Sequence, residues 1–321
     1  MRAYWGLLRL AGHALASADH PLLAHLVVTR RCNLACGYCD EYDRVSPPVP
    51  LADLDERVEA LARLHTAMIA CTGGEPLLHP ELEDVVRAIR RRGMTAMLST
   101  NGYLLTRERI ELLNTAGLQV LQLSIDVLEP DAASVKSLSL IEDRLLLLAR
   151  FARFDVNVTT MIGAGDRPSD AVEIALRVTG RGFSHSVGLA HASGGILRAI
   201  GPRERSAYGS VGRVSGSALH GFNHLLFHRR LVAGGPCRWK CRAGARFLYI
   251  CEHGCVHWCS QRRNRPEVQL RSYGAAELRR AFRTEKACAP YCTLNCVHHV
   301  SALDGWRQQN LPDAWASTPR T

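Results

Sequence analysis

Runs of apolar and β-branched residues alternate with amphipathic stretches along the first two thirds of the chain. The runs have the length of buried strands and occupy residues 25–29, 67–71, 95–99, 119–125, 156–162 and 183–190. The stretches between them have the apolar spacing of helices and occupy residues 53–65, 80–92, 106–116, 140–151 and 169–179. Six successive strand–helix units predict an α/β fold with a parallel sheet. Because a closed barrel needs eight units, we expect a partial (β/α)6 barrel.

Local signals mark the ends of several of these helices. Asp53 and Thr106 are expected N-caps, because a short side-chain oxygen can accept a hydrogen bond from a free backbone N–H of the first turn. Gly117 and Gly180 are expected just past helix ends, where a glycine readily takes the left-handed conformation.

The pattern divides the chain into four expected parts. Residues 1–20 form an N-terminal amphipathic helix, 21–202 the partial barrel and 203–235 a helical connector. Residues 236–321 form a small module that holds eight of the twelve cysteines. Within it, residues 247–250 and 256–258 are expected to pair as a hairpin.

Composition narrows the class of protein. Hydrophobic residues make up 47% of the 321, an ordinary globular value. No apolar run reaches the roughly 20 residues that cross a bilayer, and no signal peptide is recognisable, so a cytoplasmic location is expected. In that reducing compartment, twelve cysteines at short spacings favour metal or cluster ligands over disulfides.

The net charge of +10 makes nucleic acid a second class of partner to consider. The chain has 40 basic residues, of which only Lys136, Lys240 and Lys286 are lysines. The arginines are scattered, so RNA binding is an alternative that the sequence does not favour; it would show as binding that weakens steeply with salt.

The first cysteine group follows the first expected strand. Cys32, Cys36 and Cys39 have the spacing C-x3-C-x2-C, so three thiolates of one loop could hold three irons of a cubane. The fourth iron would then be open to another ligand, as in catalytic metal sites. A zinc knuckle is the alternative, but the loop contains no fourth cysteine or histidine.

This loop, with Tyr38 before its last cysteine, resembles the signature of the radical S-adenosylmethionine (SAM) superfamily. The resemblance implies a [4Fe–4S] cluster on Cys32, Cys36 and Cys39, SAM on the open iron and Tyr38 near the adenine. It also implies reductive cleavage of SAM to a 5′-deoxyadenosyl radical, which abstracts hydrogen from a substrate, here an unidentified small molecule or peptide.

Later motifs follow in the order that the superfamily has them. Gly73, Gly74 and Glu75 follow the second strand and match a motif that receives the amino group of SAM. Glycines let a backbone approach a ligand closely, and a carboxylate pairs with an ammonium group.

Polar residues end the next two strands. The resemblance places Ser99 and Asn101, after the third strand, near the ribose of SAM, and places Ser124 and Asp126, after the fourth, at the same edge of the barrel. A G-x-I-x-G-x-x-E pattern for adenine contacts is not recognisable. No catalytic acid or base is identified.

The second cysteine group resembles the SPASM/twitch modules that hold auxiliary [4Fe–4S] clusters, because Cys241, Gly254 and Cys259 follow their C-x12-G-x4-C spacing. One auxiliary cluster is favoured over two, and Cys251 and Cys255 are expected spectators. The candidate ligands are Cys237, Cys241, Cys259, Cys288, Cys292 and Cys296. A zinc ribbon that includes His257, His298 or His299 is the alternative.

The resemblance also implies a one-electron donor such as flavodoxin or ferredoxin. Two further alternatives remain at this stage. One is a non-catalytic zinc or iron–sulfur scaffold protein. The other is membrane association through residues 1–18 as an interfacial helix.

Overall fold

The computed structural model describes residues 12, 14, 17–215 and 218–305. Within these residues, nine strands form one sheet in the order β6-β5-β4-β3-β2-β1-β7-β8-β9. The first six pair in parallel: β1 (Leu23–Thr29), β2 (Met68–Gly73), β3 (Thr95–Thr100), β4 (Val120–Ser124), β5 (Asp155–Ile162) and β6 (Ser184–Leu189). These bounds confirm the six predicted strands and the partial barrel.

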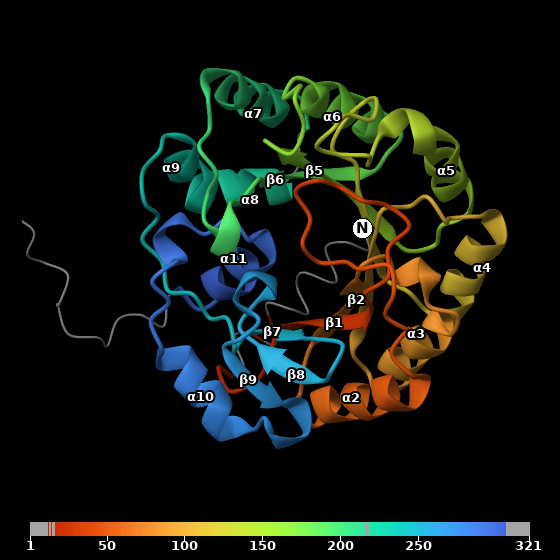
Figure 1. The fold of residues 1–321 in the computed structure, drawn as a ribbon, viewed down its shortest axis with the longest axis vertical. Coiled ribbons are helices and arrows are strands. Elements are labelled where there is room, and N and C mark those ends of the chain that lie inside the picture. Colours follow the sequence, from red (N-terminus) through yellow and green to blue (C-terminus); the bar gives the residue numbers. More distant parts are fainter. Residues whose placement is uncertain (1–11, 13, 15–16, 216–217, 306–321) are drawn as a thin grey trace, which may run out of the picture.

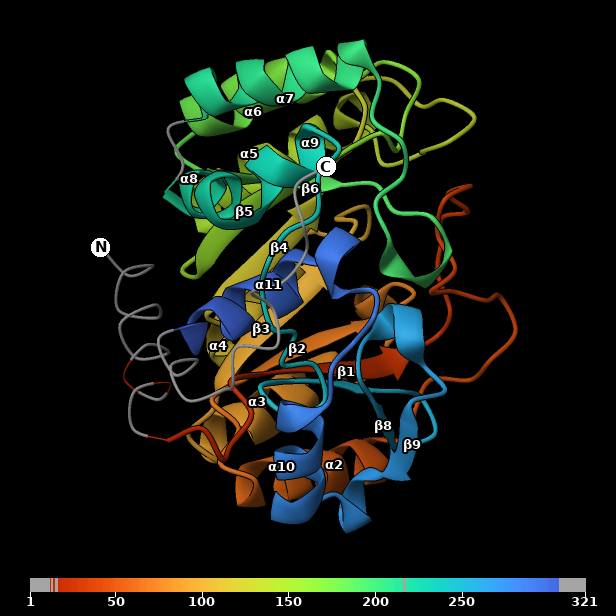
Figure 2. The same ribbon diagram turned by 90° about the vertical axis from the view of Figure 1, so that its left-hand side faces the viewer.

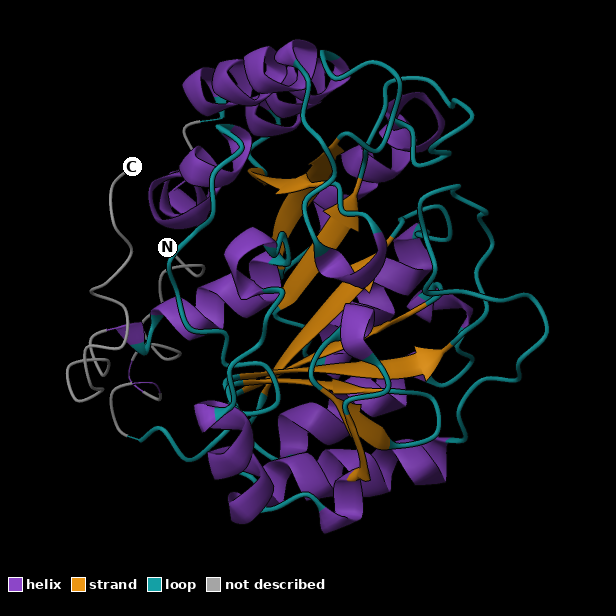
Figure 3. Cartoon of the chain, turned by 60° about the vertical axis from the view of Figure 1, so that its left-hand side comes forward, coloured by secondary structure: helices purple, strands orange, loops and turns teal. Residues whose placement is uncertain are grey.

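Helices cover the outer face of this sheet, as Figures 1 and 3 show. They are α2 (Leu51–Arg63), α3 (Leu82–Arg91), α4 (Arg107–Ala116), α5 (Leu138–Phe151) and α6 (Asp170–Gly180). Their apolar sides pack on the outward-facing residues of the strands, such as Leu26, Ile69 and Leu98, in the largest buried cluster. The predicted helices therefore form because each buries one apolar side against the sheet.

The helix ends differ in part from the prediction. Thr106 caps α4 as predicted, accepting a hydrogen bond from the Arg109 N–H, and Gly117 ends it with φ of 89°. Asp53, however, is not an N-cap, because α2 already begins at Leu51 and places Asp53 in its first turn. There its charge is favourable toward the helix dipole. Gly180 lies inside α6, and Gly182 is the left-handed residue that follows.

The cysteine-rich region continues the barrel sheet. β7 (Phe247–Ile250) pairs in parallel with β1, and β8 (Cys255–His257) and β9 (Pro266–Gln269) follow antiparallel. The predicted hairpin is confirmed, but its place beside β1 was not predicted. This pairing brings the carboxyl end of β7 to the edge of the sheet where the first cysteine loop begins.

Residues 202–232 are mostly helical, as predicted for the connector, with α7 (Pro202–Val214), α8 (Ala218–Asn223), a π-helical turn (His224–His228) and α9 (Arg229–Val232). The last helices are α10 (Ala275–Arg283) and α11 (Asn295–Ala302). Figure 2 shows α11 in front of the sheet, on the face opposite α2 and α3. Val297 and Val300 of α11 pack there against inward-facing residues such as Val27 and Ala70.

A buried ion pair ties the C-terminal region to the start of the chain. Arg246 and Asp304 are both fully buried, and the Arg246 Nε lies 2.7 Å from Asp304 Oδ2. The same guanidinium donates to the carbonyl oxygens of His20 and Ala14. One side chain therefore holds three separate segments together.

The predicted N-terminal helix falls almost wholly on residues outside the described part of the chain. Within the described part, no helix has both the length and the apolar character to span a membrane.

Candidate active site

The loop of Cys32, Cys36 and Cys39 leaves the carboxyl end of β1. All three cysteines are free thiols; Cys36 is buried and the other two are half-buried. Burial raises the pKa of Cys39, against the opposing positive charge of Lys136. Cys39 also interacts electrostatically with Cys32 and Cys36, so the loop brings the three sulfurs near one another.

Gly73, at the end of β2, and Gly74, just after it, must be glycines for a steric reason that the sequence did not indicate. A side-chain carbon on Gly74 would lie 2.2 Å from the Arg31 carbonyl oxygen, and one on Gly73 would lie 2.0 Å from that of Thr29. Gly73 also has a φ of 135°. The Gly74 N–H donates to Thr29, and the Glu75 N–H donates to Arg31. The glycines thus let the cysteine loop approach this backbone closely, and their contact with SAM stays a prediction.

Glu75 is fully buried beneath this contact. Its Oε1 accepts hydrogen bonds from the Leu77 N–H at 3.0 Å and the Thr100 hydroxyl at 2.7 Å. Its Oε2 accepts from the Asn101 N–H at 2.8 Å. Burial raises the pKa of Glu75, and these three donors oppose that rise. The carboxylate therefore links the ends of β2 and β3 by hydrogen bonds.

The ends of β3 and β4 both contact the cysteine loop. The Asn101 Nδ2 donates to Asn33 Oδ1 at 2.8 Å and lies 3.8 Å from the Cys32 sulfur. The Tyr38 hydroxyl donates to Asp126 Oδ2 at 2.5 Å. The structure therefore brings Tyr38, Asn101 and Asp126 to one edge of the sheet.

The two remaining serines lie on the inner face. Ser99 and Ser124 are half-buried and alternate along their strands with the outward-facing core residues Leu98 and Leu123. All eight predicted SAM-site residues thus lie at or beside the carboxyl edge of β1–β4. Their contacts with a ligand stay a prediction.

Lys136 is a site residue that the sequence reasoning missed. Its Nζ donates to the Tyr38 hydroxyl at 2.9 Å and lies 5.2 Å from the centre of that ring. Burial opposes its charge, but the nearby Tyr38 and Asp126 outweigh this and raise the pKa of Lys136 well above its usual value. The available signal was its rarity, since only three of the 40 basic residues are lysines.

Four cysteines of the second group surround one small cavity. Cys241, Cys259, Cys288 and Cys292 line it, together with Trp258, Arg262 and Lys286. Burial raises the pKa of Cys241 to about 11, against the positive charge of Lys286. Burial also raises the pKa of Cys259, and the neighbouring thiols Cys241, Cys288 and Cys296 add to the rise. A metal would have to displace these protons on binding.

The other C-terminal cysteines lie elsewhere. Cys296 is on α11 next to the cavity and interacts electrostatically with Cys241 and Cys259. Cys237 packs with the residues around α7–α9, and its sulfur donates to the Phe227 carbonyl at 2.9 Å, so the structure does not place it among the cavity cysteines. The thiols of Cys251 and Cys255 interact with each other at the hairpin end, and their role as spectators stays a prediction.

Both cysteine groups offer thiols that could hold iron–sulfur clusters. Among the described residues, no three His, Cys, Asp or Glu side chains converge to hold one ion. A cubane requires no such convergence, because each thiolate binds its own iron. The buried, free and mutually adjacent thiols of both sites provide the sulfur donors that such a cluster takes.

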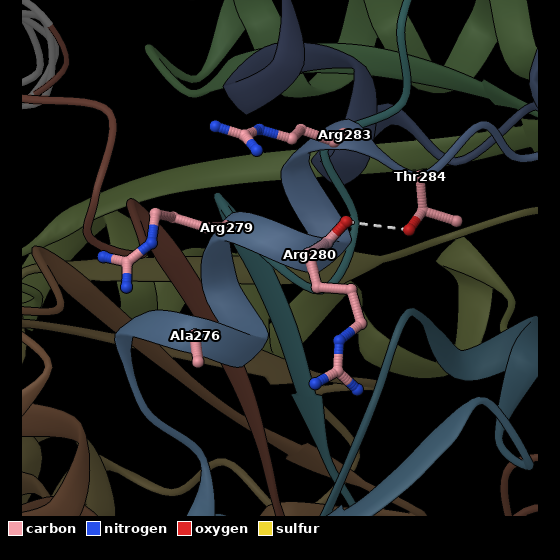
Figure 4. A pocket seen from close by; sticks show the side chains of 5 residues that line it. All are labelled: Ala276, Arg279, Arg280, Arg283 and Thr284. Carbon is pink, nitrogen blue, oxygen red and sulfur yellow. Dashed lines mark hydrogen bonds between the residues drawn. The ribbon is translucent and has the colours of Figure 1, made fainter.

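A broad hollow on the outer side of α10 contains none of this chemistry. It is lined by Ala276, Arg279, Arg280, Arg283 and Thr284 (Figure 4). The figure shows the arginine side chains spreading away from one another, and the Thr284 hydroxyl bonding to the Arg280 carbonyl. With no thiol, carboxylate or histidine in its lining, it is not a cluster site.

Replacing Cys292, which lines the cavity, and Cys237, which does not, should have different effects on iron content. Replacing Cys292 with alanine should lower the iron bound at the second site, because one iron of the cubane would lose its thiolate. Cys237→Ala is the matched variant and should keep the full iron content, because its sulfur bonds to a carbonyl outside the cavity. Iron and sulfide analysis after anaerobic reconstitution measures both. Equal losses in the two variants would contradict the assignment.

Comparison with known proteins agrees with this geometry. The sequence profile of the radical SAM superfamily matches residues 26–178. This stretch belongs to the radical SAM superfamily. It holds the first cysteine loop and every polar strand end described above.

Two curated relatives are each similar to part of this chain. The PqqA peptide cyclase of Gluconobacter oxydans is 35% identical over 143 residues, which are 43% of this chain and 39% of that protein. The GTP 3′,8-cyclase of Microcystis aeruginosa is 41% identical over 110 residues, 32% of this chain and 33% of that protein. The chain thus matches less than half the length of either relative.

A solved structure extends the likeness of fold beyond residue 178. Streptococcus suis SuiB bound to precursor peptide SuiA aligns with a TM-score of 0.62, covering 90% of this chain and 74% of that one at 14% identity. The sheet with its surrounding helices, including the part beyond residue 178, therefore has the same overall fold as that solved structure.

Proposed function

We propose that this chain is a radical SAM oxidoreductase that acts on a peptide or small molecule and carries one auxiliary [4Fe–4S] cluster. The proposal rests on one observation. The loop of Cys32, Cys36 and Cys39 is in close backbone contact with the Gly74–Glu75 turn at the carboxyl edge of the sheet. That edge is where parallel α/β sheets bind their ligands.

The residues have distinct roles in this proposal. Cys32, Cys36 and Cys39 would hold the SAM-binding cluster, and Cys241, Cys259, Cys288 and Cys292 the auxiliary one. When bound, the first cluster supplies the electron that splits SAM into methionine and a 5′-deoxyadenosyl radical.

The residues at the strand ends would bind and orient SAM. Glu75, which is fully buried, fixes the turn that borders it through its hydrogen bonds to Leu77, Thr100 and Asn101. Tyr38 is held in place by Asp126 and Lys136. The Lys136 ammonium lies at this edge as a cation that could receive the carboxylate of SAM.

The lining of the barrel supports a peptide or a small molecule over RNA. On the inner face of β4–β6, Asn157 donates to Thr159 and Ser186, and the Thr159 and Ser186 hydroxyls bond to each other. Gln122 lies beside Asn157 on the neighbouring strand. These are neutral groups that suit amides and hydroxyls, whereas RNA binding needs basic side chains. The relatives named for peptides, PqqA cyclase and SuiB, support the same class.

We also propose a reducing location such as the cytoplasm and a one-electron donor such as flavodoxin or ferredoxin. The free state of all twelve cysteines supports the first. The need for one electron per SAM cleaved supports the second. The expected boundaries of the parts, at about residues 20, 202 and 235, belong to this proposal as well.

The test is SAM cleavage by the reconstituted protein. Under anaerobic conditions with dithionite and SAM, the chain should release 5′-deoxyadenosine, measured by chromatography and mass spectrometry. Cys36→Ala should lower the yield at least about 100-fold, because two thiolates no longer hold a cluster that can reduce SAM. Cys71→Ala is the matched control, since Cys71 is a buried core thiol on β2. Equal yields from Cys36→Ala and the unchanged chain would refute the proposal.

A further inference from the structure

Lys286 is a buried cation beside the second cysteine group. Its side chain lines the cavity with Cys241, Cys259, Cys288 and Cys292, and the residue is only 6% exposed. Its Nζ donates to the Ala281 carbonyl oxygen and lies 5.1 Å from the centre of the Trp258 ring. Both contacts hold the ammonium group in place, but neither brings a negative charge to it.

Two arginines lie near the same cavity, and the carboxylate of Asp304 offsets part of the charge of one of them, Arg242. Arg262 lines the cavity, and its guanidinium lies against Gly194. Arg242, next to Cys241, is 5% exposed, donates to the Phe282 carbonyl at 2.6 Å and lies over that ring. Among the ion pairs of residues 17–215 and 218–305, none joins a carboxylate to Lys286, Arg262 or Arg242.

A buried cation without a carboxylate is costly unless another anion offsets it. Four thiolates with their iron–sulfur core carry net negative charge and would lie where the cavity is. We propose that Lys286 is the counter-charge of the auxiliary cluster and raises its reduction potential. This inference rests on the proposed assignment of that cluster to Cys241, Cys259, Cys288 and Cys292.

The effect of Lys286 on the reduction potential follows from the charge that one electron adds to the cluster. On reduction, the cluster with its thiolates takes up one electron from the titrant and gains one negative charge. A fixed ammonium group stabilises the reduced form more than the oxidised form, so it favours reduction. In a protein interior, a unit charge within about 10 Å shifts such an equilibrium by about tenfold.

The first site has a different balance of charge. Its cysteines lie near Glu41 and Glu75 as well as Lys136, so negative groups accompany its lysine. The auxiliary cluster is therefore expected to be the more easily reduced of the two. This would suit it to accept electrons rather than to supply them to SAM.

The test uses the full chain with Cys32, Cys36 and Cys39 all replaced by alanine, so that only the auxiliary cluster remains. Titration with dithionite and redox mediators, followed by electron paramagnetic resonance, gives its midpoint potential. Lys286→Met should lower the ratio of reduced to oxidised cluster at fixed potential by about tenfold, about 59 mV for one electron. Lys286→Arg, which keeps the charge, should stay within about threefold of the parent.

The matched control is Arg279→Met on α10 (Figure 4). It removes the same charge from the neighbouring helix, but at an open hollow where water screens it, so the midpoint should not move. If Lys286→Met fails to load a cluster, Lys286→Gln supplies the neutral comparison.

The outcomes separate the two proposals. If the triple-alanine parent binds no iron, the assignment of the auxiliary site fails, and the role of Lys286 fails with it. If the cluster loads fully and Lys286→Met leaves the midpoint unchanged, or if Arg279→Met shifts it equally, the role of Lys286 alone is overturned.

Discussion

Replacing Gly74 with alanine is expected to abolish SAM cleavage and to remove the first cluster while the second stays bound. The added carbon would lie 2.2 Å from the Arg31 carbonyl oxygen and 2.4 Å from that of Arg30, inside the backbone that leads to Cys32. Both neighbours are backbone atoms, which cannot move aside as the tip of a side chain can. Relief must therefore come from displacing the cysteine loop itself.

The measurement separates this local effect from misfolding. Iron content should fall by about half, and the 5′-deoxyadenosine yield to the background of Cys36→Ala, while the auxiliary cluster keeps its paramagnetic signal. Gly180→Ala is the matched control, because a carbon added there, in α6, meets no atom within 4 Å. It should be neutral or slightly stabilising. Full iron binding and SAM cleavage by Gly74→Ala would show that the close contact between Gly74 and the backbone of the cysteine loop is not needed.

Replacing Asp304 with alanine should produce the largest loss of stability among single changes outside the cysteine sites. It would leave the Arg246 guanidinium fully buried without its carboxylate. Removing one partner of a buried ion pair costs about 3–5 kcal/mol. The free energy of unfolding in urea, measured on cluster-free reduced protein, tests this.

Two comparisons make the result specific. Glu173→Ala breaks the exposed pair with Arg177, where both side chains are 44% exposed, and should cost less than about 1 kcal/mol. The double variant Arg246→Met, Asp304→Leu should recover most of the loss, because apolar replacement of both partners removes the stranded charge. A loss below about 1 kcal/mol in Asp304→Ala would show that water or another group takes the place of the carboxylate.

Local sequence signals were enough to predict the strands, the helices of the barrel and the two groups of cysteines. These features depend on local periodicity and on short spacings: alternation along β5, amphipathic spacing along α3, and three cysteines within one loop. Such signals can be recognised in the sequence without knowing which segments are neighbours in the fold. The N-cap at Asp53 failed because helix starts depend on a few weak and competing local preferences.

Which residues contact one another depends on how the chain packs, and local sequence signals do not show it. The roles of Gly74 and Glu75 depend on β1 and β3, which lie far from them in sequence. The separation of Cys237 from the four cavity cysteines depends on how residues 227–292 fold back, which spacing does not encode.

The positions of two lysines also depend on packing between distant segments. Lys136 lies at the first cysteine site although it is distant in sequence from that loop, and Lys286, which is close in sequence to Cys288, also lies beside the distant Cys241 and Cys259. The physical reason is that burial and electrostatic neighbourhood are properties of the packed chain. Contacts between distant segments, rather than residue order, determine which charge stands beside which thiol.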